Sequence, residues 1–114
     1  MNKRYGLRKN TDFRHVYDEG KSYANKYIVM FFIKNELDFN RVGFATTKKL
    51  GNSVVRSKLK RRMKESYRLN TTKFKQGYDI IFLCRANAKD TTYREVESAI
   101  LHLGKISKLL IKEK

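Results

Sequence analysis

A basic stretch between residues 48 and 68 constrains this chain more than any other feature. It reads KKLGNSVVRSKLKRRMKESYR, and it holds nine of the chain's 27 lysines and arginines but a single acid, Glu65. Gly51 and Asn52 interrupt the preceding pattern, and either Asn52 or Ser53 can cap the free amides of a helix that begins there. The stretch is therefore predicted to be a turn followed by a helix.

An apolar residue recurs at every fourth position of this helix. At about 100° per residue the four side chains cover a stripe roughly 120° wide, which suits one face packed on a core. They are Val55, Leu59, Met63 and Tyr67. The opposite side carries Ser57, Lys58, Arg61, Lys64, Glu65 and Arg68.

The charge on that opposite side is almost all positive. A solvated helix face usually interleaves acids with lysines, because such pairs stabilise the helix, and this face does not. Arg56 and Lys58 also lie in the first turn, where the helix dipole disfavours cations, whereas Lys48, Lys49 and the free amides beside them favour an incoming phosphate. We therefore expect contact with nucleic acid, and a solvated face is the alternative.

Length and charge set the class of protein. With 114 residues and no linker-like segment, the chain is expected to form one domain. Its net charge of +16 predicts attraction to a polyanion, either RNA, DNA or an anionic membrane surface. One cysteine excludes an internal disulfide, and the longest apolar run, residues 27–33, is far shorter than the roughly 20 residues of a membrane span. No secretory signal is evident at residues 1–10. We expect a reduced, cytoplasmic protein without a membrane partner.

The first half of the chain predicts a basic arm, a helix and three extended segments. Residues 1–9 lack periodicity and suggest a mobile basic arm or a frayed terminus. A short helix, capped by Asn10 or Thr11, should run to Glu19 and stop at Gly20. A short extended piece at residues 22–24 precedes a doubly covered strand at 26–34, KYIVMFFIK, and residues 41–47 should return as an antiparallel strand.

Alternation assigns the strand residues to faces. Tyr27, Val29, Phe31 and Ile33 share one face of the long strand, and Ile28, Met30 and Phe32 share the other. On the returning strand the small side chains of Gly43, Ala45 and Thr47 share a face. They predict open space above the sheet, beside Phe31.

The second half supplies one strand and one helix. Residues 78–85, YDIIFLCR, form the strand, after a polar stretch at 70–77. A last helix capped by Thr91 or Thr92 should reach about Lys112, with an inner stripe of Val96, Ile100, Leu103, Ile106 and Leu110. The order α-β-β-β-α-β-α predicts an α/β sandwich, of the α+β kind, with helices packed on a four-stranded sheet.

The sequence offers few residues that could carry out catalysis in the protein itself. His15 and His102 fall on different predicted helices, and no metal-ligand spacing is present. Cys84 lies in an apolar strand, which favours a buried inert thiol over a nucleophile. Asp79 and Asp90 can bind magnesium, but isolated aspartates at element ends are usually solvated or capping. We expect no catalytic residue and no metal site.

Aromatic residues accompany the positive charge. Phe13, Tyr17 and Phe31 fall beside the small residues, where each ring is either core or a stacking platform. Rings among lysines suit single-stranded nucleic acid, because unstacked bases lie on the rings while the lysines follow the backbone.

Residues 48–61, KKLGNSVVRSKLKR, resemble the signature of the bacterial ribonuclease P protein subunit, K-K-x-G-x-A-V-x-R-N-[RK]-x-K-R, which opens a basic helix called the RNR motif. The resemblance extends to Asp12-Phe13 and Val16-Tyr17, to residues 20–25, to Arg41-Val42-Gly43 and to Asp79-Ile80-Ile81. Ser57 stands where the family usually has asparagine, and the proline that often follows the last strand of the family is absent.

The resemblance implies the same element order with a left-handed parallel crossover, against the usual rule. It also implies that a large RNA carries the catalytic site and uses magnesium held mainly by that RNA, while the protein binds this RNA and the single-stranded 5′ leader of precursor tRNA. No protein oligomer is required. The implied contacts to the catalytic RNA are Lys48, Arg56, Ser57, Lys58, Lys60, Arg61, Arg62, Lys64 and Arg68. The implied leader contacts are Phe13, Tyr17, Val29, Phe31, Ala45 and Lys49.

Two other classes of function remain open from the sequence. One is a ribosomal or other structural RNA-binding protein without a leader groove. The other is an autonomous nuclease that uses Asp79 and Asp90.

Overall fold

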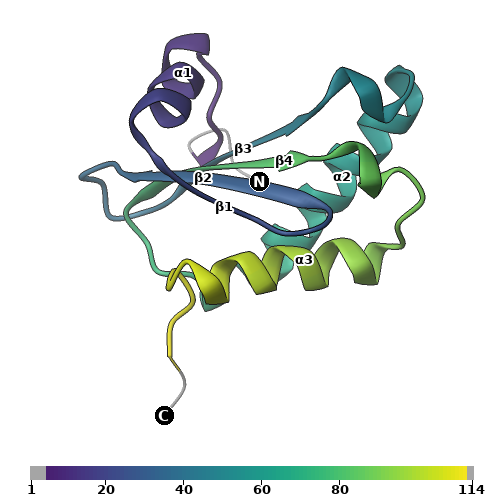
Figure 1. Ribbon diagram of the computed structural model, residues 1–114. Helices are drawn as coiled ribbons and strands as arrows, with labels where there is room; N and C mark the ends of the chain where they lie inside the picture. Colours follow the sequence, from purple (N-terminus) through teal and green to yellow (C-terminus); the bar gives the residue numbers. More distant parts are fainter. Residues whose placement is uncertain (1–4, 113–114) are drawn as a thin grey trace.

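A four-stranded sheet separates one short helix from two longer helices (Figure 1). The computed structural model describes residues 5–112. Along the described chain the elements are α1 (Asn10–Glu19), β1 (Lys21–Ala24), β2 (Ile28–Lys34), β3 (Arg41–Thr46), η2 (Lys48–Leu50), α2 (Ser53–Asn70), η3 (Thr71–Lys73), β4 (Tyr78–Cys84), η4 (Ala86–Ala88) and α3 (Tyr93–Ile106), where η marks a short 3-10 turn. The predicted α-β-β-β-α-β-α order is confirmed.

The strands lie in the order β1-β2-β4-β3. β4 pairs antiparallel with β2 and parallel with β3, so it fills the space between them. β3 does run antiparallel to β2, as the sequence predicts, but the two strands do not pair because β4 separates them. The last strand of the chain is therefore a central strand, and β3 is left at the edge.

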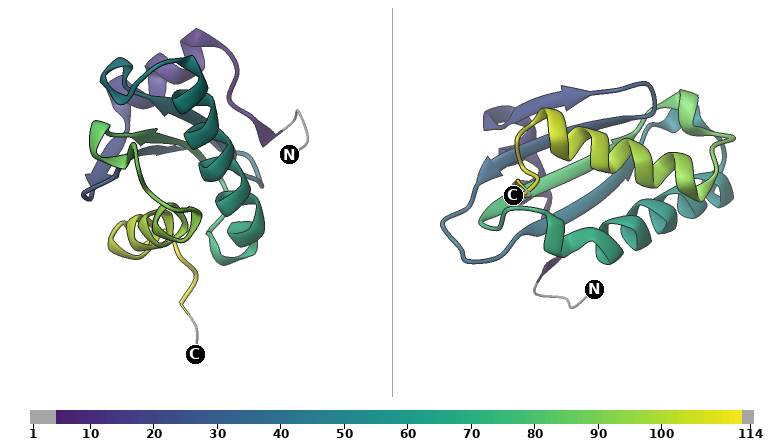
Figure 2. Two further views of the ribbon diagram at one scale, coloured as in Figure 1. Left: turned by 90° about the vertical axis from the view of Figure 1, so that its right-hand side faces the viewer. Right: turned by 90° about the horizontal axis from the view of Figure 1, so that it is seen from below.

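The parallel connection from β3 through α2 to β4 is a left-handed crossover. Figure 1 shows β3 and β4 running in the same direction, with α2 crossing below the sheet. The view from below in Figure 2 shows β3 at the edge of the sheet opposite β1. Viewed from the start of β3 and β4 toward their ends, the path from β3 through α2 to β4 turns anticlockwise, which is the left-handed sense. This agrees with the hand implied by the family resemblance and departs from the general preference for right-handed crossovers.

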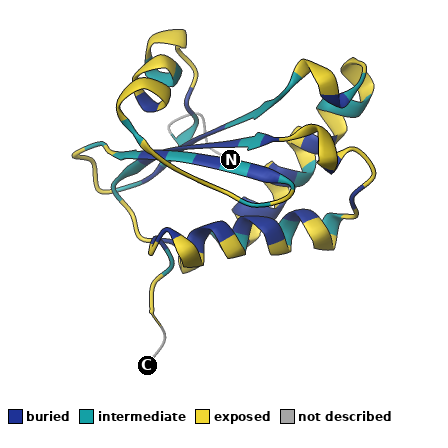
Figure 3. Cartoon of the chain, in the orientation of Figure 1, coloured by how far each residue is buried: buried dark blue, intermediate teal, exposed yellow. Residues whose placement is uncertain are grey.

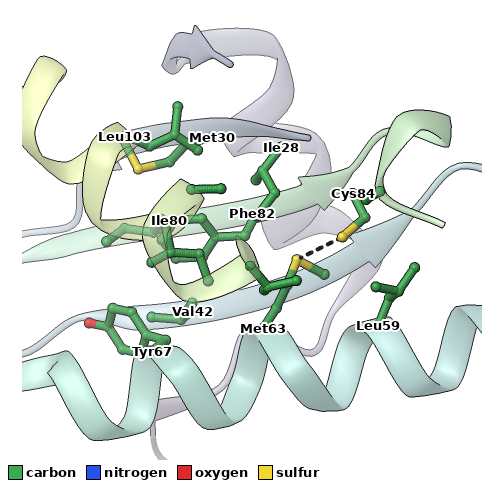
Figure 4. Packing of buried hydrophobic residues seen from close by; sticks show 14 of the residues in the cluster. Ile28, Met30, Val42, Leu59, Met63, Tyr67, Ile80, Phe82, Cys84 and Leu103 are labelled. Atoms are coloured by element: carbon green, nitrogen blue, oxygen red, sulfur yellow. Dashed lines mark hydrogen bonds between the residues drawn. The ribbon is translucent and has the colours of Figure 1, made fainter. Parts of the chain in front are cut away.

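The larger part of the core lies between the sheet and helices α2 and α3 (Figures 3 and 4). The alternation of β2 is confirmed, because Ile28, Met30 and Phe32 are buried on this side. β4 adds Ile80, Phe82 and Cys84, and α2 adds three residues of its predicted stripe, Leu59, Met63 and Tyr67, with Val55 partly buried beside them. Thus α2 buries the predicted face and turns its basic face outward.

A smaller apolar cluster lies on the α1 side of the sheet. Leu7, Val16 and Ile81 are buried there, and Phe13, Phe31, Ile33 and Ala45 pack against them partly exposed. Val16 is the buried residue of α1. In Figure 1 the helix sits over one end of the strands and leaves the other end of this face without a covering helix.

Gly6 and Leu7 of the N-terminal segment are docked on the sheet edge, within residues 1–9 where the sequence suggests a mobile basic arm or a frayed terminus. The N–H of Leu7 donates to the Val42 carbonyl at 3.1 Å, and Leu7 itself is buried. The arrangement adds a short parallel bridge, between Gly6 and Val42, to the outer side of β3. Residues 1–4 of the predicted arm lie outside the described residues.

The N-terminal caps of α2 and α3 are among those predicted from the sequence, whereas the cap of α1 is not. Asn52 caps α2, since its side chain accepts from the Val55 N–H at 3.1 Å. Thr92 caps α3 in a capping box with Glu95, whose carboxylate accepts from the Thr92 N–H and whose pKa is lowered mainly by that bond. The predicted cap of α1 is wrong, because Asn10 is already helical and Lys9 occupies the cap position without a side-chain bond.

α3 ends at Ile106, six residues before the predicted Lys112. Beyond it Lys108 adopts a positive φ of 66°, and the N–H groups of Leu109 and Leu110 both donate to the Gly104 carbonyl. Gly104 makes this reversal possible, because a Cβ there would lie 2.8 Å from Leu110 Cδ2. Leu110 consequently forms a bridge to Phe74 after the chain turns, and Ile106 is partly exposed.

Arg41 and Asp79 form a bidentate ion pair that joins β3 to β4 where both strands begin. Arg41 Nε lies 2.8 Å from Asp79 Oδ1 and Nη2 lies 2.5 Å from Oδ2, and Asn35 Nδ2 also donates to Oδ1 at 2.9 Å. The Asp79 side chain is only 4% exposed. Arg41 further lies 3.7 Å from Asp12 of α1, so this pair connects the sheet to the helix above it.

Asp79→Ala should lower the free energy of unfolding by about 3 kcal/mol, because it leaves a partly buried guanidinium without its main partner. Asp90→Ala is the matched control, since Asp90 is exposed, and it should change stability by less than about 0.5 kcal/mol. Urea denaturation of both variants measures the difference. Equal effects would show that the ion pair does not hold the sheet.

Candidate nucleic-acid interface

The outer face of α2 presents cations that no acid neutralises. Ser57, Lys58, Lys60, Arg61 and Lys64 are all exposed. Among the described residues the ion pairs involve Arg41 and Arg68, so the three lysines and Arg61 form none. Because a free ammonium or guanidinium retains its capacity to bind an anion, this face suits a phosphate backbone.

Three arginines predicted for the same interface are held differently. Arg62 is half-buried and donates through Nη1 to the Thr91 carbonyl, which ties α2 to the segment before α3. Arg68 Nη2 lies 2.5 Å from Glu65 Oε1, and the hydrogen bond between them raises the pKa of Arg68 and lowers that of Glu65. Arg56 is half-buried, with its Nε buried and unpartnered in the described residues. Their contact with RNA stays a prediction.

A hollow of about 470 Å³ lies between the basic face of α2 and the outer edge of β3. We call it the edge pocket. Its lining comes from the N-terminal segment, α1, β3 and α2 and consists of Gly6, Leu7, Arg8, Phe13, Val42, Gly43, Phe44, Ser57, Lys60, Arg61 and Lys64. Arg8 and Phe44 were missed as site residues, because only the docking of the N-terminal segment brings Arg8 to α2.

The predicted leader residues of the sheet lie in two cross-strand rows on the α1 side. Phe31 of β2 and Gly43 of β3 are both paired with Ile81 of β4. One step further along the strands, Val29 and Ala45 are both paired with Leu83, and all three are partly exposed. We call this second set, Val29, Leu83 and Ala45, the open row. Leu83 was missed, although alternation in residues 78–85 would have placed it on this face.

The first row is covered by aromatic rings. Tyr17 and Phe31 meet edge to face with ring centroids 4.8 Å apart, and Phe13 lies 6.4 Å from Tyr17. Phe31 is half-buried, whereas Tyr17 is 38% exposed. Burial raises the pKa of the Tyr17 hydroxyl. The rings are therefore partly core and partly surface.

The predicted open space above Gly43 is wrong. A Cβ at Gly43 would lie only 2.5 Å from Phe13 Cζ, so the Phe13 ring fills that position. Ala45, which belongs to the same predicted set of small side chains, lies one step toward the end of β3 in the open row and is partly exposed. The turn η2 follows there, with Leu50 buried and Lys48 and Lys49 exposed.

Two of the potential catalytic groups, Asp79 and Cys84, are hydrogen-bonded within the protein or buried. Both carboxylate oxygens of Asp79 accept hydrogen bonds from Arg41 or Asn35, which leaves the carboxylate closed to a metal ion. Cys84 is buried, and desolvation raises the pKa of its thiol to about 12, so the thiolate form is scarce at neutral pH. Its sulfur lies 3.5 Å from Met63 Sδ (Figure 4).

Comparison with known proteins decides the family. The Ribonuclease P family model matches residues 1–108. The ribonuclease P protein component of Alkaliphilus metalliredigens is 55% identical over 104 residues, which cover 91% of this chain and 94% of that protein. The chain belongs to the ribonuclease P protein family. The protein component of Clostridioides difficile is 45% identical over 106 residues, covering 92% and 93% of the two chains.

Solved structures of ribonuclease P proteins share the fold. The protein from Staphylococcus aureus superposes with a TM-score of 0.86 at 36% identity and covers 94% of this chain and 98% of its own. The protein from Thermotoga maritima gives 0.82 at 32% identity, with coverage of 95% and 98%. The predicted family and fold class are confirmed.

As a ribonuclease P protein component, the chain is the accessory subunit of an endoribonuclease and has an RNA partner. This membership removes the reading of an independent nuclease that uses Asp79 and Asp90. None of the helices in residues 5–112 has the length and apolar content needed to cross a bilayer.

Arg61 and Arg62 are neighbours in sequence with different predicted sensitivities. Arg62→Ala should cost about 1.5 kcal/mol of stability, because the charge-assisted bond to the Thr91 carbonyl is lost. Arg61→Ala should stay within about 0.5 kcal/mol, since Arg61 is exposed without an ion pair. Urea unfolding of the two variants tests this. If Arg62→Ala leaves the unfolding midpoint unchanged, the bond to Thr91 contributes little to stability, and Arg62 is then available to bind RNA.

Proposed function

We propose that this protein binds the RNA subunit of ribonuclease P through the basic face of α2. Lys58, Lys60, Arg61 and Lys64 supply the freest charges, and Ser57 adds a hydroxyl beside them. Lys48 extends this surface, and Arg56, Arg62 and Arg68 flank it with charges already held in part by the protein. The observation that supports the proposal is a row of exposed cations without acidic partners.

We further propose that the single-stranded 5′ leader of precursor tRNA crosses the α1 side of the sheet. Phe13, Tyr17 and Phe31 offer ring surface, and Val29 and Ala45 with Leu83 offer a shallow apolar floor. Lys49 stands at the end of β3 to meet a phosphate. Unstacked bases bind such platforms with little sequence preference, which suits a leader of variable sequence.

Magnesium does not match the donor set of this surface. Hard divalent cations prefer carboxylate and carbonyl oxygens, whereas the outer face of α2 carries cations and a hydroxyl. Its acid, Glu65, is bonded to Arg68. In this proposal magnesium is held mainly by the RNA, and the protein acts in the cytoplasm as one copy that supplies no catalytic group.

Reconstitution with a bacterial ribonuclease P RNA tests this function. The protein should lower the magnesium concentration needed for 5′ maturation of precursor tRNA, because its cations neutralise phosphates that magnesium would otherwise screen. Cleavage is measured across a magnesium series with and without the protein. A protein that binds the RNA without improving cleavage would match the alternative of a ribosomal or other structural RNA-binding protein.

Phe31→Ala should weaken binding of precursors with long leaders by about 1 to 3 kcal/mol, the value of one base stacked on a ring. Phe31 is half-buried, so the cost in stability should be less than half of the about 3 to 5 kcal/mol of a core phenylalanine. The measurement is holoenzyme affinity for precursors with graded leader lengths, together with urea unfolding.

Phe82→Ala is the matched control, because Phe82 is fully buried beneath the sheet. It should lose stability heavily and affect all precursors alike. If Phe31→Ala behaves in the same way, Phe31 belongs to the core and the proposed leader surface is wrong.

A further inference from the structure

We propose that the edge pocket takes one unstacked nucleotide of RNA, with its base against the edge of β3 and its phosphate between Arg8 and the cations of α2. The proposal rests on the proposed function only in naming RNA as the source of the nucleotide. It adds Arg8 and the backbone of Phe44 to the residues that bind.

Charge on two sides of the pocket supports an anionic occupant. Arg8 enters from the N-terminal segment, and Lys60, Arg61 and Lys64 enter from α2. All four are exposed, none forms an ion pair in the described part of the chain, and no acid lines the pocket. The volume of about 470 Å³ lies within the range of about 300 to 1,000 Å³ typical of small-ligand sites.

The inner wall of the pocket is an unpaired strand edge. Thr47 donates its N–H to Cys84 of β4, whereas the Val42 carbonyl accepts from Leu7 on the opposite side. Because backbone groups alternate along a strand, Phe44 also faces away from β4. Its N–H and C=O are the next outward pair after the stretch bridged by Gly6 and Leu7, and no other described segment reaches them.

A nucleobase satisfies this edge better than a bare phosphate does. Unpaired bases carry donors and acceptors side by side on their edges, so one base can bond to both an N–H and a C=O. Phe13 and Phe44, both partly exposed, line the pocket beside that edge and offer apolar surface to the base. An acidic peptide strand pairing with β3 is the competing occupant.

Three probes distinguish these occupants on the full protein in low salt. The backbone amide signals of Leu7 and Phe44 are followed by NMR while 5′-AMP, ribose 5-phosphate or hexaglutamate is added. We expect 5′-AMP to shift the Phe44 amide, and ribose 5-phosphate to bind more weakly and leave that amide in place. Equal binding of the two, or a Phe44 amide moved only by hexaglutamate, would overturn the proposal.

Arg8→Ala should raise the Kd for 5′-AMP about five- to tenfold, as expected for the loss of one charge-assisted contact. Arg94→Ala is the matched control, since Arg94 is exposed on α3 and does not line the pocket, and it should change the Kd less than about twofold. If both variants raised the Kd equally, 5′-AMP would be held only by the general positive charge of the protein, and the proposed binding site would be wrong. Because no ribonuclease P RNA is used, this result is independent of the reconstitution test.

Discussion

The position of β4 between β2 and β3 determines the rest of this structure. β4 is the last of the four strands in sequence but occupies a central position. The chain must therefore leave β3, run back along one face of the sheet as α2, and re-enter the sheet between β2 and β3. That crossing presses Leu59, Met63 and Tyr67 into the core and turns the basic face of the same helix outward. The bidentate pair of Arg41 and Asp79 joins the two parallel strands at their start, and the buried carboxylate keeps both oxygens hydrogen-bonded.

The shortness of α1 creates the second surface. Ten residues cover only one end of the sheet, where Val16 and the Phe13 ring close over Ile81 and Gly43. The open row beyond them lacks a covering helix (Figure 1). Phe13 borders both this face and the edge pocket, so the two proposed RNA surfaces meet on either side of the edge strand β3. A single RNA strand that leaves the α1 side of the sheet can therefore reach the edge pocket without passing around the protein.

Sequence reasoning succeeded where the physical signal is local. Alternation in β2 and the four-residue stripe of α2 each assign side chains to faces without knowledge of the partner, and both were confirmed. It failed where the determinant is distant in sequence. The insertion of β4 and the docking of Leu7 on Val42 depend on contacts between segments that no local pattern records. Likewise Arg62 belongs to the same basic run as Arg61, and only the fold shows that it bonds to Thr91. The left-handed crossover came from family resemblance alone, since general rules favour the other hand.

Ser57 shows how a change in one side chain can alter a contact without altering the surface. It stands where the family usually has asparagine, and it lines the edge pocket beside Lys60, Arg61 and Lys64. A hydroxyl is shorter than a carboxamide and supplies one donor where the amide supplies two. The electrostatic attraction of the pocket is untouched, because the neighbouring cations remain. What changes is one directional hydrogen bond, which a bridging water can replace at small cost. In the proposed complex the substitution therefore affects the hydrogen bonding of a single polar group of the RNA, while the lysines and Arg61 still supply the phosphate contacts.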